Sequence, residues 1–65
     1  MLAVYGKHKN DKRFRGFNFD NGTFEPNKIN TTVFINSKEV RNRLQNEVDF
    51  MNEQNKEYTF EIREI

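Results

Sequence analysis

Basic side chains near the start of the chain are the residues best suited to chemistry with an anion. They lie on both sides of a polar turn at residues 10–12, together with His8 and a single acid, Asp11. The candidate phosphate-binding set is Lys7, Lys9, Lys12, Arg13 and Arg15. Lys and Arg at a hairpin tip can contact the phosphates of a nucleic acid or nucleotide. The alternative, which we favour, is a solvated turn whose lysines discourage edge-to-edge pairing of the sheet.

The stretch RFRGFNFDNG, residues 13–22, raises the question of aromatic recognition of bases. Residues 15–17 and Phe19 match the first positions of the RNA-stacking signature of the RRM fold. The match then fails, because Asn18 replaces a small residue and Gly22 stands where the last aromatic belongs. An RRM also needs two helices and a longer chain. We therefore interpret this stretch as a core strand.

Catalysis and metal binding have few candidate residues in this chain. His8 is the one histidine, and it has neither a second histidine nor a carboxylate at ligand spacing. Ser37 is the one serine and is better placed to cap a helix. The carboxylates in the second half fall at positions expected to face solvent: Asp49, Glu53, Glu57, Glu61 and Glu64. We expect no enzyme, no metal site and no cofactor.

Length and composition indicate one small domain over residues 1–65. Hydrophobic residues make up 34% of the chain, and seven Phe and two Tyr compensate for this small share. There is no cysteine and no apolar run long enough for a membrane span, so we expect an intracellular protein without a membrane partner. The net charge of +1 divides into +3 over residues 1–36 and −2 over residues 37–65.

Hydrophobic periodicity predicts the order strand, strand, strand, helix, strand. The predicted strands cover residues 2–9, 13–19, 29–35 and 57–65, with a short return arm at 23–25. This order indicates an α+β domain in which one amphipathic helix packs on a small, antiparallel-rich sheet of three to four strands.

The predicted helix begins at a cap on Asn36 or Ser37 and ends within residues 52–56, with Asn55 a candidate for a left-handed C-cap. One apolar stripe at helical spacing is expected to be core: Val40, Leu44, Val48 and Met51.

Two glycines predict local features of the backbone. Asn21-Gly22 favours a tight type I′ hairpin turn, in which both central residues have positive φ. Gly16 coincides with a slip in the alternation, because Phe14 falls out of phase with Phe17, and this predicts a β-bulge.

Strand parity divides the aromatic residues between two faces of the sheet. The face under the helix is expected to take Leu2, Val4, Phe17, Phe19, Val33, Phe60 and Ile62. The opposite face would then carry a candidate partner-binding surface of Tyr5, Phe14, Phe34 and Arg63, with Phe50 added from the helix. The alternative is that the sheet curls, or that the loop at 20–30 covers these rings.

The opening Lys- and Phe-rich strands, NGTFEPNKI, TTVF, the helix ending MNEQN and the closing YTFEIREI resemble small phage and mobile-element proteins of low-GC bacteria. The resemblance covers most of the chain as a pattern of spacing and carries over no catalytic residue. It implies the host cytoplasm and a compact accessory role, such as blocking a host protein, including a defence nuclease.

These observations support two functional hypotheses. The first is a phage-type protein-binding module, an inhibitor or adaptor, that forms a homodimer or a complex with a host protein through the aromatic residues. The second is a nucleic-acid or nucleotide binder that uses the basic hairpin at residues 7–15.

Overall fold

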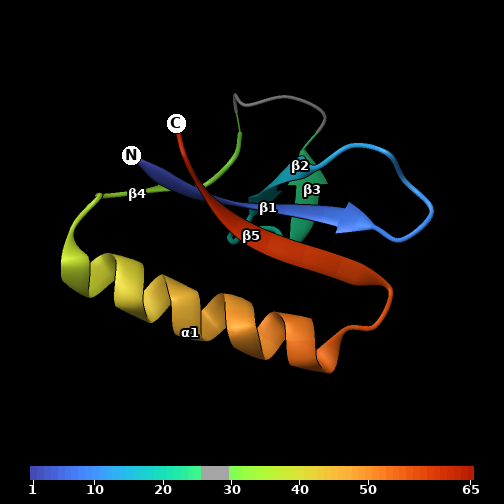
Figure 1. Ribbon diagram of the computed structural model, residues 1–65. Helices are drawn as coiled ribbons and strands as arrows, with labels where there is room; N and C mark the ends of the chain where they lie inside the picture. The colour runs from blue at the N-terminus through green and yellow to red at the C-terminus, as the bar shows by residue number, and fades with distance from the viewer. Residues whose placement is uncertain (26–29) are drawn as a thin grey trace.

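The computed structural model in Figure 1 describes residues 1–25 and 30–65. Its elements are β1 (Leu2–His8), β2 (Arg15–Asn18), β3 (Thr23–Glu25), β4 (Val33–Phe34), α1 (Lys38–Gln54) and β5 (Tyr58–Glu64). The predicted α+β class is confirmed, with one helix lying against one face of an antiparallel sheet. The return arm at 23–25 forms a strand of its own, so the sheet has five strands.

β1 is the central strand of the sheet. It pairs with β5 along its whole length, from Leu2 opposite Glu64 to His8 opposite Tyr58. The other edge of β1 is shared, because β2 pairs near Tyr5 and β4 pairs near Leu2. β3 extends the sheet beyond β2. Figure 1 shows β1 and β5 side by side above the helix, with β2 and β3 behind them.

Gly16 lies near the point where β2 ends and β4 begins along the same edge of β1, and this position requires a glycine. The Thr32 amide donates to the Phe17 carbonyl (3.2 Å), and the Thr32 hydroxyl accepts from the Phe19 amide (2.8 Å). Thr31 packs so closely on Gly16 that a Cβ there would clash with its side chain. The predicted bulge is wrong, since the pairing through Gly16 is regular. Simple alternation places Phe14 on the face opposite Phe17, and glycine is required by the close approach of Thr31.

The core lies between α1 and the β1–β5 pair. It comprises Leu2, Val4, Leu44, Val48 and Phe60, and the partly buried Met51 packs against it. Leu44, Val48 and Met51 of the predicted helical stripe are therefore confirmed as core, whereas Val40 is half-buried and lies outside this cluster. Within the described residues, no helix combines the length and the apolar character needed to cross a membrane.

A side chain caps the N-terminal end of α1, and another side chain bonds the backbone just beyond its C-terminal end. The Ser37 hydroxyl accepts from the Val40 amide (3.2 Å), which identifies Ser37 and not Asn36 as the N-cap. The predicted left-handed C-cap is wrong, because Asn55 is extended, with φ −125°. Its side-chain oxygen instead accepts from the Glu57 amide (3.1 Å), so the side chain supports the chain as it leaves the helix.

The hairpin between β2 and β3 is a four-residue loop over residues 19–22 and not a type I′ turn. Gly22 has φ +65°, but Asn21 does not have positive φ. The Asn18 side-chain oxygen accepts from the amides of Asp20 (2.9 Å) and Asn21 (3.2 Å). These bonds satisfy the loop backbone, so a single residue at positive φ is enough.

Phe34 lies on the helix side of the sheet, contrary to the prediction. It is directly opposite Leu2 in the β1–β4 ladder, and opposite residues of an antiparallel pair share a face. Its ring meets Phe19 edge to face, with centroids 5.6 Å apart. Val33, predicted to be core, points to the other face and is 44% exposed. The predicted strand also started at residue 29, which lies outside the described residues.

Candidate partner-binding site

One flank of α1, which we call the β5 flank, is closed by polar side chains. The Asn52 amide donates to the Phe60 carbonyl (3.0 Å), and its oxygen accepts from the Phe60 amide (2.7 Å). Near the other end of β5, Glu64 accepts from Arg41 (2.9 Å) and from Asn36 (2.7 Å). Sequence reasoning missed Asn52 because nothing local marks a helix residue that bonds to a strand backbone eight positions later.

The opposite flank of α1, which we call the hairpin flank, carries two hollows. The first, of about 510 Å³, lies among Phe17, Phe24, Tyr58 and Phe60 from the strands and Phe50 and Met51 from the helix. The second, of about 480 Å³, lies among Phe19, Thr32 and Phe34 from the sheet side and Val40, Arg43 and Leu44 from the helix. Glu47 lines both hollows.

Packed aromatic rings form the wall of the first hollow. Phe24 stacks on Tyr58 with centroids 5.0 Å apart and on Phe60 with centroids 5.9 Å apart. Phe17 meets Phe24 edge to face at 5.3 Å. A Cβ at Gly6 would collide with Phe24 and Phe60, so this glycine makes room for the rings. The wall is therefore fixed by packing, whereas Phe50 on the rim is 57% exposed.

The charged residues of the hairpin flank are unpaired within the described part of the chain. Arg43 and Glu47 are both exposed and have no ion pair or side-chain hydrogen bond there. The two charges remain available to a bound molecule.

The predicted aromatic face divides between two sides of the molecule. Tyr5, Phe14 and Arg63 do meet on the face away from the helix, where the Arg63 guanidinium lies 4.9 Å from the Tyr5 ring centre and 4.6 Å from that of Phe14. Arg63 also bonds Glu61 (2.6 Å), and Tyr5 is only 8% exposed. Phe34 and Phe50 lie on the hairpin flank. Tyr5, Phe14 and Arg63 therefore contact one another on the far face, and Phe34 does not join them as predicted.

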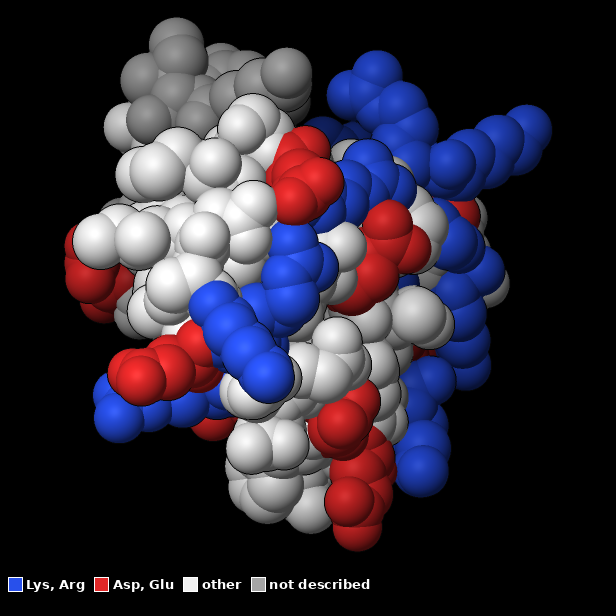
Figure 2. Space-filling view, turned by 60° about the vertical axis from the view of Figure 1, so that its left-hand side comes forward, with Lys and Arg blue, Asp and Glu red and all other residues white. Residues whose placement is uncertain are grey.

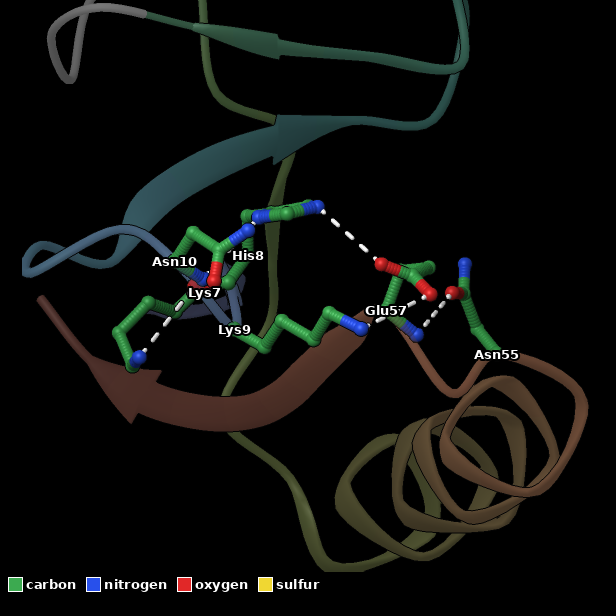
Figure 3. A network of polar contacts seen from close by, with 6 residues as sticks. All are labelled: Lys7, His8, Lys9, Asn10, Asn55 and Glu57. Atoms are coloured by element: carbon green, nitrogen blue, oxygen red, sulfur yellow. Dashed lines mark hydrogen bonds and ion pairs between the residues drawn. The ribbon is translucent and has the colours of Figure 1, made fainter.

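Most basic side chains of the hairpin at residues 7–15 have an ion-pair or hydrogen-bond partner nearby. Glu57 contacts Lys9 (3.3 Å) and His8 (3.5 Å), as Figure 3 shows. The Lys7 ammonium donates to the Asp11 carbonyl (2.9 Å). Arg15 lies 3.5 Å from the Asp11 carboxylate. Of the five predicted phosphate ligands, Lys12 and Arg13 are the two without such a partner among the described residues.

The Asp11 carboxyl has a lowered pKa. Desolvation alone would raise this pKa, but amide donation from Lys12 and Arg13 and the charge of Arg15 outweigh it. Asp11 is therefore charged at neutral pH and offsets part of the positive charge of the hairpin. Figure 2 shows Lys and Arg side chains along the right-hand margin and across the middle of this view, with acidic side chains among those in the middle.

The described residues include no group of three or more His, Cys, Asp or Glu side chains placed to hold a metal ion. No protein-family model, curated protein or solved structure matches this chain.

The two hollows on the hairpin flank are the strongest candidate site, because they combine concave apolar surface with two unpaired charges.

Proposed function

We propose that the protein is a non-covalent protein-binding module whose binding surface is the hairpin flank of α1. The observation that carries this proposal is Phe50, a large apolar side chain that is 57% exposed at the rim of a packed aromatic wall. Apolar surface left open beside a concave aromatic wall is typical of protein interfaces, where aromatic anchors supply most of the binding energy.

The resemblance to phage and mobile-element proteins suggests the role of such a module. We propose an inhibitor or adaptor that acts on a protein of the bacterial host, with defence nucleases as one class of target. The packed core and the capped helix support this role, because a preformed surface loses little conformational freedom on binding.

The local pairing of the basic hairpin favours this proposal over phosphate binding. A phosphate would have to compete with Glu57 for Lys9 and with Asp11 for Arg15. The Lys12 and Arg13 side chains alone would make few phosphate contacts, and non-specific affinity grows with the number of phosphates neutralised.

Capture from host lysate tests the proposal when it is run with matched variants. The wild-type protein should retain a specific protein after nuclease treatment. Phe50→Ser should lose it, whereas Lys12→Ser, an exposed change of similar size on the hairpin tip, should retain it. Capture that depends on Lys12 and disappears with nuclease would instead support nucleic-acid binding. Sedimentation of the purified protein would show whether the retained partner is a second copy.

A further inference from the structure

The two hollows are spaced regularly along α1. The first borders the helix at residues 47–54 and the second at residues 40–47, so the midpoints of these two helical stretches lie seven residues apart. At a rise of 1.5 Å per residue, this separation is about 10.5 Å. A molecule that fills both hollows must therefore present two apolar groups about 10.5 Å apart on one side.

This spacing selects among the conformations of a bound segment. Residues i and i+7 of an α-helix share a face and lie about 10.5 Å apart. In a strand, residues on one face lie about 6.6 Å apart at i+2 and about 13 Å apart at i+4, and neither value fits. An amphipathic helix is thus the segment whose side chains match the two hollows.

Charge adds a third requirement. Glu47 lines both hollows and has no ion-pair partner within the described residues, so it faces the middle of the occupant. Asp20 adds a second carboxylate at the second hollow, where Arg43 is the one cation among the described lining residues. A positive side chain three or four positions after the first anchor would lie opposite Glu47.

A second copy of this chain does not meet these requirements through its own helix. Phe50 is the one large apolar side chain of α1 that is exposed, so the outer face of α1 lacks a second anchor seven residues away. A helical occupant must therefore come from a different protein.

We infer that the two hollows bind an amphipathic helix of a partner protein that carries apolar residues at i and i+7 and Lys or Arg at i+3 or i+4. This inference rests on the proposed function and specifies the recognised segment. Glu47 determines the charge preference, and the aromatic wall with Phe50 holds the two anchors.

Selection from a randomised library of displayed helical peptides tests the inference. Wild-type protein should enrich peptides with apolar residues seven positions apart and Lys or Arg between them. Glu47→Lys, a change at an exposed position that leaves the core intact, should enrich Asp or Glu at the middle position instead. A synthetic peptide from the wild-type selection should bind about two- to fivefold more tightly than its Lys→Gln counterpart, as expected for an exposed ion pair.

Peptides without the seven-residue spacing, the same middle charge with Glu47→Lys, or no enrichment at all would each overturn the inference. These outcomes differ from failure of the proposed function. A host protein captured in a Phe50-dependent manner would still support protein binding even if the peptides showed no such pattern. Absence of any Phe50-dependent partner would remove the function itself.

Discussion

The two flanks of α1 meet the same sheet in opposite ways. On the β5 flank, Asn52 bonds both backbone groups of Phe60, and Arg41 and Asn36 hold Glu64. On the hairpin flank, half-buried aromatic rings border two open hollows, and Arg43 and Glu47 have no described partners. One flank is closed with hydrogen bonds, and the other is left apolar and open.

Backbone geometry explains why the β5 flank needs closing. Just beyond the ends of the β1–β5 ladder, Glu57 bonds Lys9 and Ile65 bonds Met1, so the odd-numbered residues of β5 direct their backbone groups toward β1. Even-numbered residues such as Phe60 direct theirs to the outer edge, where another chain could pair with them. Asn52 replaces that pairing at mid-strand. The backbone groups of Phe60 are therefore bonded within the fold, whereas the ring of Phe50 stays exposed.

The substitution expected to have the largest effect, Leu44→Asp, should unfold the domain and so remove both flanks of α1. Leu44 is 6% exposed in the core beneath α1 and also lines the second hollow. Leu44→Asp would bury an unpaired carboxylate there, so we expect the domain to unfold. Circular dichroism should show loss of the helix. Asn42→Asp, an exposed change on the same helix, should leave the spectrum intact. A folded Leu44→Asp protein would contradict the packing described for α1.

Asn52→Leu should open the closed flank. It removes two hydrogen bonds to the partly buried backbone of Phe60, and each such bond contributes about 0.5–1.5 kcal/mol. We expect the free energy of unfolding to fall by about 1–3 kcal/mol in urea titrations, with concentration-dependent association through the freed edge. Asn46→Leu, an exposed asparagine of α1, is the matched control and should change stability by less than about 0.5 kcal/mol. Equal effects of the two variants would remove the role assigned to Asn52.

Gly22→Val should strain the backbone of the β2–β3 hairpin without a steric clash of the added side chain. No atom lies within 4 Å of a Cβ at this position, so the effect comes from φ +65°, which a β-branched residue avoids. We expect a loss of about 1–2 kcal/mol in thermal or urea unfolding. Gly22→Asn should recover much of this loss, because asparagine tolerates the left-handed region. Equal stability of the Val and Asn variants would show that the backbone at 22 is not held at positive φ.

Phe50→Ser should have the smallest effect on stability and the clearest effect on binding. Because Phe50 is 57% exposed, its removal should lower the free energy of unfolding by less than about 1 kcal/mol. Phe34→Ser should cost more, because Phe34 packs against the core and touches Phe19. A large destabilisation by Phe50→Ser would mean that this ring is structural, and the contrast between the flanks would weaken.

Local periodicity was sufficient to predict the helix and the fold class. The predicted stripe recurs at helical spacing whatever surrounds it, and the structure places Leu44, Val48 and Met51 of that stripe in or against the core. The face of Phe34 was not predictable in this way. β4 is only two residues long, and its orientation depends on the register with Leu2 across the sheet.

Within the candidate site, the sequence predicted which side chains are exposed better than it predicted which side chains touch one another. Phe50 was expected outside the apolar stripe and is exposed at the rim of the first hollow. Tyr5, Phe14 and Arg63 were expected on one face and are, but alternation could not show that the guanidinium lies against both rings. The hollows themselves lie between α1 and side chains from separate parts of the sheet, so they are a property of the assembled fold.

The pairing of β1 with β5 also governs when this domain can fold. The seven residues from Leu2 to His8 pair with the seven from Tyr58 to Glu64, so the two longest strands lie at opposite ends of the sequence. Contacts of such long range slow folding, because the intervening chain must close before they form. On the ribosome, the central strand remains without its main partner until β5 has left the exit tunnel. The nascent chain therefore completes its sheet only after residue 64 has emerged.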